Sequence, residues 1–290
     1  MHIPDGFLTP PVWLTLDAIS ASAIGWIAHR ADRMGPLESP TTSRLPMLGV
    51  MGAFVFAAQM INFPVGLGAS GHLLGGSLLA IVLGPAVAAL VMTVVLVLQA
   101  LLFQDGGILT LGANVFNMAL AGVAAGYLPT LLWGRSTIPI FLGGALSVLT
   151  SGALVLSQLN LSGTAIAGRP LSIALALFAL TAVLEGAITV GAVRAIERLS
   201  PQSFHARSPI PFAARAAFAS AALALAICGA WISSTSPDAL QQFAASVGLE
   251  AHPAWPYAPL AGYELGDLSS TGLAGLAFVF AICAVGRKKH

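Results

Sequence analysis

The chain has 290 residues, of which 57% are hydrophobic and only 8% are charged, and its formal net charge is +1. Its mean hydropathy of +0.88 is far too high for a soluble domain, so the composition indicates a membrane protein that contacts the lipid bilayer. A charge this close to neutral gives no reason to expect nucleic acid as a partner.

Nine apolar runs are predicted to cross the membrane as helices. A spanning helix needs about 20 apolar residues to cross about 30 Å of hydrocarbon, and eight runs are close to or above this length. These runs are residues 12–29, 46–63, 85–103, 109–133, 138–159, 171–196, 212–232 and 269–285. A shorter run from His72 to Leu83 ends at Gly84-Pro85, where a helix is expected to break.

The basic residues orient these predicted helices. Cytoplasmic loops collect Lys and Arg, and with the N-terminus outside eleven of the twelve basic residues lie inside, all except Arg169. We therefore predict an all-α polytopic membrane bundle of about nine spans, with the N-terminus outside and the C-terminus inside. A seven-span module covers residues 1–200, a polar and proline-rich cytoplasmic linker covers 201–211, and a two-span hairpin with an external loop covers 212–290.

Motifs for enzymatic chemistry are weak in this sequence. The only lysines are Lys288 and Lys289, so a phosphate-binding G-x-x-x-x-G-K-[ST] loop is excluded and the chain is not expected to hydrolyse ATP. The segment 66–71 matches the dinucleotide fingerprint, but it opens no βαβ unit and is interpreted as a flexible outer loop. Its G-x-S-G around Ser70 is also typical of intramembrane serine proteases, which need a histidine from another helix as base. No suitably placed histidine is predicted, and we do not expect an enzyme.

Four polar residues within predicted spans have open roles. Ionisable side chains in the bilayer are costly and often functional. Asp17 and Glu185 could belong to an ion path, or could simply hydrogen-bond a neighbouring helix or loop. Asn114 and Asn117 are three residues apart and share a helix face near the outer side, where they could support a site or join helices.

The first residues of the chain, MHIPDG, indicate a metal site on the outer face. The α-amine of Met1, the backbone nitrogen of His2 and the His2 imidazole can close fused chelate rings around one ion. A fourth nitrogen would complete a square, and His72 is the candidate because it is expected on the same outer face. An all-nitrogen planar site favours Ni(II) or Cu(II), with Co(II) also possible.

The residues that follow His2 favour a chain start that folds back into the protein. Pro4 biases the residue before it towards extended backbone, and Asp5-Gly6 is a turn signal. Methionine is expected to stay attached, because aminopeptidases generally remove it only before small residues. An α-amine and an imidazole must both be deprotonated to bind a metal, so metal capture is expected to weaken below about pH 6.

Three segments carry a family resemblance: MHIPDGFL, then GHLLGGSLLAIVLGP around His72, then LGANVFNMALAG. From Met1 to about residue 200 the chain resembles the NikM/CbiM family of substrate-capture subunits of energy-coupling-factor transporters for nickel and cobalt. The resemblance implies a metal held by the α-amine, the residue-2 amide and imidazole, and a loop histidine, at positions Met1, His2 and His72. It also implies cytoplasmic ATPase subunits and a transmembrane coupling (T) subunit as partners, in the bacterial cytoplasmic (inner) membrane. The metal is the cargo, and no cofactor is expected.

The external loop of the hairpin carries a second resemblance. SPDAL at residues 236–240, followed by GYELGDLSSTGLAGLAF, resembles the PDGLE-type domain of the NikN component. This chain has Ala239 and Gln241 where that motif usually has glycine and glutamate. These departures weaken a direct role for the acids of the loop in metal binding, and Asp238 could instead simply make the outer face mildly anionic. The NikN-like hairpin favours nickel over cobalt.

We therefore expect the substrate-specific component of an ECF-type ABC importer that captures Ni(II) or Co(II). One alternative is a self-sufficient divalent metal channel or secondary carrier, which would transport without ATP. A more remote alternative is an intramembrane serine protease, which would lose activity on Ser70→Ala. Small residues on the first span, including Ala21 and Gly25, could admit the coupling subunit or could pack within this chain.

Overall fold

A computed structural model describes residues 1–33, 45–66, 68–199, 216–217, 219–225, 234, 236–255 and 257–259 of the chain. The described part is mainly helical, as predicted. The linker predicted over 201–211 and the span predicted over 269–285 lie outside the described residues. Within the run predicted over 212–232, residues 219–225 are helical.

Helices form over the apolar runs of the first module. Three of the runs are single helices of 24 to 32 residues: α1 (Pro10–Arg33), α7 (Thr137–Leu161) and α8 (Gly168–Leu199). A shorter helix, α2, covers Leu45–Gln59. Two further runs contain π-helix. Helix α4 (Pro85–Leu98) continues as η1 (Gln99–Phe103), and α5 (Leu111–Asn114) continues through η2 (Val115–Gly122) into α6 (Val123–Trp133). Among the described residues, five continuous helical segments are long and apolar enough to cross a membrane.

The break predicted at Gly84-Pro85 is confirmed. Helix α3 covers Gly76–Leu83, and α4 begins directly after Gly84, whose φ of 88° and ψ of 152° favour glycine. Pro85 suits the first position of a helix because the backbone N–H that proline lacks would have no partner there. However, α3 has only eight residues, about 12 Å, and begins four residues after His72. The short run at 72–83, the third of the nine predicted crossings, therefore does not form a full spanning helix. The nine-span topology stays a prediction.

A short antiparallel hairpin replaces the flexible loop expected at residues 66–71. Strand β1 (Phe63–Gly66) pairs with β2 (Ala69–Gly71), with Phe63 opposite Gly71. The prediction of a flexible loop here was wrong, although the described part of the chain is otherwise mainly helical. Because β2 ends at Gly71, the hairpin fixes the backbone immediately before His72.

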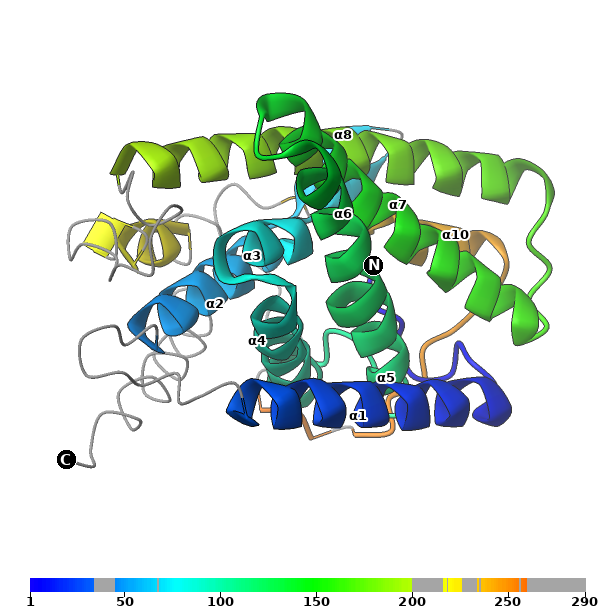
Figure 1. The fold of residues 1–290 in the computed structure, drawn as a ribbon. Coiled ribbons are helices and arrows are strands. Elements are labelled where there is room, and N and C mark those ends of the chain that lie inside the picture. The colour runs from blue at the N-terminus through cyan, green and yellow to red at the C-terminus, as the bar shows by residue number, and fades with distance from the viewer. Residues whose placement is uncertain are drawn as a thin grey trace.

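The helices enclose the start of the chain. In Figure 1, α1 and α8 lie along opposite sides of the bundle, and the N-terminus lies between them near the centre. Helices α7 and α8 approach closely where a Cβ on Gly144 would lie 2.8 Å from the Cα of Gly186. Helix α10 (Ala239–Ser246), from the region predicted as a C-terminal hairpin, packs against α8. The buried core includes Met1 and Ile3, so the chain start is part of the packed interior.

Candidate metal site

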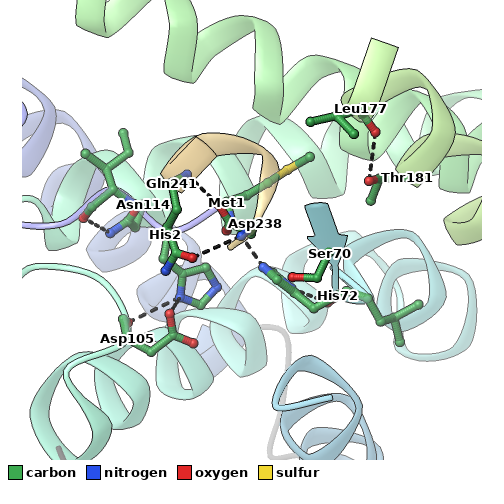
Figure 2. A network of polar contacts seen from close by, with 12 residues as sticks. Met1, His2, Ser70, His72, Asp105, Asn114, Leu177, Thr181, Asp238 and Gln241 are labelled. Atoms are coloured by element: carbon green, nitrogen blue, oxygen red, sulfur yellow. Dashed lines mark hydrogen bonds and ion pairs between the residues drawn. The ribbon is translucent and has the colours of Figure 1, made fainter. Parts of the chain in front are cut away.

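The first three residues are buried in the centre of the bundle. Met1, His2 and Ile3 are 5%, 6% and 0% exposed. Figure 2 shows the Met1 amine, the two imidazoles and two carboxylates facing one another. The sequence-predicted residues Met1, His2 and His72 are therefore brought together by the fold.

The loop after η1 holds the N-terminal segment by its backbone. Asn114 pairs with Ile3 as a side-chain amide does with a peptide: Asn114 Oδ1 accepts from Ile3 N at 2.8 Å and Nδ2 donates to Ile3 O at 3.1 Å. Thr110 Oγ1 and Gly107 N donate to the same carbonyl at 2.6 and 2.9 Å. Of the two roles left open for Asn114, the structure shows the supporting one.

Asp5 anchors the turn that the sequence predicted. Its carboxylate accepts hydrogen bonds from the backbone N–H groups of Ile108, Leu109 and Thr110 at 2.9 to 3.3 Å. A Cβ at Gly107 would overlap Asp5 Oδ1, so glycine is required where the two segments meet. The chain start is thus locked against residues 107–114 before any metal is considered.

The Met1 amine lies between two partners from distant parts of the chain. Its nitrogen is 3.0 Å from His72 Nε2, and it forms an ion pair with Asp238 Oδ2 (Figure 2). The other ring nitrogen of His72 is 3.1 Å from the carbonyl oxygen of Leu73. If that nitrogen carries the ring proton, Nε2 has a free lone pair aimed at the amine, as a metal ligand requires.

His2 does not yet present the nitrogen that a fused chelate needs. Nδ1, the ring nitrogen nearest its own backbone, is 3.1 Å from Asp105 Oδ1 and 3.2 Å from the Asp105 carbonyl oxygen. The centroids of the His2 and His72 rings are 5.3 Å apart and the rings are nearly perpendicular. His2 Nε2 is buried and has no hydrogen-bond partner in the described part of the protein. Chelation through Nδ1 therefore requires the ring to turn away from Asp105.

Burial and charge favour metal-ready forms of the nearby groups. Burial lowers the pKa of His72 to about 3, with further lowering by the positive Met1 amino group and by His2. Burial alone would raise the pKa of Asp238 and of Asp105. The Met1 amino group outweighs it at Asp238, and His2 outweighs it at Asp105, so both pKa values are lowered. The site therefore combines a neutral imidazole with two carboxylates.

Side chains alone do not form a metal site in this region. Within the described ranges, no three His, Cys, Asp or Glu residues are grouped closely enough to hold an ion. The buried Met1 amine adds a main-chain nitrogen donor beside the His2 and His72 imidazoles. This is the chemistry that the MHIPDG sequence predicts.

The other polar residues singled out within the spans have structural contacts. Asn117 and Gln158 exchange hydrogen bonds between their amides at 2.8 and 2.6 Å, which joins η2 to α7. Asp17 Oδ1 accepts from Gly112 N at 2.7 Å and ties α1 to α5. Of the roles left open for these two, the structure shows hydrogen bonding to neighbouring elements.

Glu185 supports the loop that carries His72. Its two carboxylate oxygens accept from Leu74 N and Gly75 N, each at 2.8 Å, and its side chain is fully buried in α8. These contacts fix the backbone two and three residues after His72. Glu185 thus positions the predicted ligand from a helix that contributes no ligand itself.

Replacing Glu185 with glutamine is expected to weaken metal binding and lower stability. Glutamine offers one acceptor oxygen, so one of the two backbone N–H groups would lose its partner, at a cost of about 1–3 kcal/mol. The thermal unfolding midpoint in detergent and the Ni(II) affinity should both fall. Glu197→Gln, on the same helix but paired with Arg194, should leave Ni(II) affinity unchanged. Equal affinity in both variants would contradict a positioning role.

The sequence did not identify two carboxylates at the site. Asp105 follows η1 in the stretch QDGG, a polar turn signal between two apolar runs that could have drawn attention to it. Asp238 is 237 residues from Met1, and no local signal links them. Ser70, considered as a protease nucleophile, instead donates its hydroxyl proton to the carbonyl oxygen of Ser236 at 2.6 Å. That contact gives the protease alternative no support.

Comparison with known proteins adds to this geometry. Residues 2–203 match the CbiM family, described as the cobalt uptake substrate-specific transmembrane region. An Archaeoglobus fulgidus protein with the provisional name fused nickel transport protein NikMN is 32% identical, over 99% of this chain and 97% of its own length. A Haloquadratum walsbyi protein provisionally named a metal transport protein is 37% identical, over 69% of this chain and 92% of its own. A crystal structure of a truncated transition metal transporter is similar with a TM-score of 0.58 and 28% identity, covering 68% of this chain and 99% of that one.

Proposed function

Because this chain belongs to the CbiM family of cobalt-uptake substrate-specific transmembrane regions, we propose that it captures Ni(II) or Co(II) for import, using nitrogen ligands from Met1, His2 and His72. The observation that carries the proposal is the buried Met1 amine 3.0 Å from His72 Nε2. Burying a charged amine is costly unless an opposite charge lies beside it, and in this structure Asp238 supplies that charge. Metal capture gives this arrangement a purpose.

Nickel is the favoured cargo. Three or four nitrogen donors from an amine, an amide and imidazoles suit Ni(II), and Co(II) accepts the same donors. The relative that is similar over nearly the whole chain carries a nickel-transport name, whereas the family description refers to cobalt. We therefore propose Ni(II) as the preferred ion and Co(II) as a competing one.

The ligands are supported by two separate parts of the protein, and we propose a way of releasing the metal from this arrangement. Met1 and His2 are held through Asn114 and neighbouring residues, whereas His72 is held by Glu185 of α8. Relative movement of these two supports would separate the ligands without breaking either support. We propose that this separation opens the site and that partner subunits drive it.

The proposed partners are cytoplasmic ATPase subunits and a transmembrane coupling (T) subunit, as in an ECF-type ABC importer. The sequence lacks the lysine of a phosphate-binding loop, so ATP hydrolysis has to come from another chain. The small residues Ala18, Ala21, Ser22 and Gly25 of α1 are exposed in the structure. They do not pack within the described chain, which favours their proposed role as a surface for the coupling subunit.

The proposed location is the bacterial cytoplasmic (inner) membrane, with the N-terminus outside and the C-terminus inside. Support comes from the five described segments able to span a membrane and from the predicted nine-span topology, in which eleven of the twelve basic residues lie on one side. The module boundaries 1–200, 201–211 and 212–290 stay predictions. The similarity of the fused NikMN protein over 99% of this chain supports a NikN-like second module.

Transport assays in liposomes separate this proposal from a self-sufficient channel or carrier. The purified chain alone should bind Ni(II) but should not move it across the membrane. Uptake should appear only when coupling and ATPase subunits are reconstituted with it and ATP is supplied. Ni(II) uptake by the chain alone, driven by its gradient, would contradict the proposal and favour the channel or carrier.

Acidic pH is expected to weaken Ni(II) binding, although His72 is not the cause. Since the pKa of His72 is lowered to about 3, this imidazole stays neutral until the pH falls towards that value. The other nitrogen ligands must release protons when the metal binds, so affinity should fall at least about tenfold between pH 7 and pH 5. Calorimetry in buffers of different ionisation enthalpy should also detect protons released on binding. Equal affinity at pH 5 and pH 8 would contradict the ligand set.

A further inference from the structure

A segment of the C-terminal module, residues 236–255, lies directly against the metal site. Ser70 N donates to the carbonyl oxygen of Pro237 at 2.9 Å, and Ser70 Oγ donates to that of Ser236 at 2.6 Å. Ser70 is two residues before the proposed ligand His72. We call this segment the external loop. These two hydrogen bonds fix its position against strand β2, which leads into the site.

Helix α10 anchors the external loop by its apolar face. Leu240, Phe243 and Ala244 are buried, and α10 packs against α8 and β2. Beyond the helix the loop returns over the chain start, where His252 N donates to Asp5 O at 2.8 Å and Ala254 N donates to Asp5 Oδ2 at 3.0 Å. The chain start is thus enclosed between residues 104–114 and the external loop.

The two carboxylate oxygens of Asp238 make different contacts. Asp238 is the N-cap of α10: Oδ1 accepts from Gln241 N at 2.8 Å, and Gln241 Oε1 accepts from Asp238 N at 2.9 Å. This capping box fixes the carboxylate plane. The remaining oxygen, Oδ2, contacts the Met1 amine (Figure 2).

Charge balance makes this oxygen relevant to a bound metal. A divalent ion held by a neutral amine, neutral imidazoles and one deprotonated amide keeps a net charge of +1. Such a charge in a buried site is unfavourable unless an anion lies beside it. Asp238 is placed for this purpose because an oxygen in contact with the amine nitrogen is within reach of an ion bound to that nitrogen. The side chain of Asp105 is more exposed than that of Asp238, 33% against 13%, and it contacts His2 rather than the amine.

We propose that Asp238 is an oxygen ligand of the captured metal, so that the site is shared between the two modules. The proposal rests on the proposed function of Met1, His2 and His72. Nitrogen donors from the first module would define the plane, and the carboxylate would approach from the external loop. A metal bound in this way links the two modules.

The test compares Asp238→Asn with two control variants by Ni(II) titration and visible absorption. Asparagine is also a good N-cap, so Asp238→Asn removes the charged oxygen while keeping the helix start. Affinity should fall by about 10- to 100-fold, and the absorption of bound Ni(II) should change to that of a planar four-nitrogen complex. Gln241→Ala, which removes the other half of the capping box, and Glu250→Gln, which neutralises an exposed acid of the same loop, should retain the wild-type spectrum.

Hydrogen exchange of the external loop separates ligation from docking. Weaker binding and an altered spectrum in Asp238→Asn, with the loop still protected from exchange, would support the proposal. An unchanged affinity and spectrum would overturn it. Weaker binding accompanied by loss of loop protection, and reproduced by Gln241→Ala, would also overturn it, because Asp238 would then only hold the loop. Failure of the wild-type chain to bind Ni(II) would instead contradict the proposed function.

Discussion

Three glycines added ahead of Met1 are expected to abolish tight Ni(II) binding. The extension converts the amine into a peptide nitrogen, whose lone pair is delocalised, and moves the new amine away from His72. It also leaves the partly buried Asp238 without its ion-pair partner. The affinity loss should exceed about 100-fold, because replacing residues that only support metal ligands already lowers affinity by roughly 10- to 100-fold. Calorimetric titration of protein cleaved to leave either Met1 or Gly-Gly-Gly-Met1 measures the difference.

The matched control for the extension carries the same three added glycines at the other end of the chain. Its Ni(II) affinity should equal that of the unmodified protein. Acetylating the Met1 amine adds fewer atoms than a residue, and it should give the same loss as the extension. Tight binding by the extended or acetylated protein would mean that the metal is held elsewhere.

His72→Ala is expected to have an effect of similar size. The variant removes the ligand whose Nε2 faces the Met1 amine, and it leaves the chelating nitrogens of Met1 and His2 in place. Titration should show Ni(II) affinity lower by more than about 100-fold. The visible spectrum of any remaining complex should indicate a nitrogen ligand replaced by water.

Two other histidines provide matched controls for His72→Ala. His252 belongs to the external loop and contacts the chain start through its backbone N–H, and its side chain is exposed. His29 is exposed on α1. Alanine at either position should leave Ni(II) affinity within about twofold of wild type, because neither imidazole approaches the amine. A similar loss in all three variants would indicate non-specific histidine binding.

Much of the helical organisation could be predicted from local sequence. The apolar runs gave the helices of the first module to within a few residues, and Gly84-Pro85 marked the break between α3 and α4 because both residues act on their own backbone. The sequence did not predict π-helix in η1 and η2. Both flank the loop that holds Ile3, and such segments are frequent at functional sites. Their extra turn width depends on tertiary packing, which apolar periodicity does not report.

The candidate site was predictable only as far as its chemistry is local. Met1 and His2 are adjacent, and their chelating atoms follow from covalent structure. His72 could be chosen by topology, because the loop before His72 and the chain start were both expected outside. Asp238 was considered only as a possible diffuse surface charge, whereas the structure shows a partly buried helix cap paired with the amine. That contact depends on how two modules dock, and no spacing within either module encodes it.

Location of the bound metal tests the central claim most directly. Crystals of the unextended protein soaked or grown with Ni(II) can be measured at wavelengths on either side of the nickel absorption edge. We predict one strong anomalous peak within bonding distance of the Met1 amine, the His2 nitrogens and His72 Nε2. A peak elsewhere, with the Met1 amine still paired to Asp238, would contradict it.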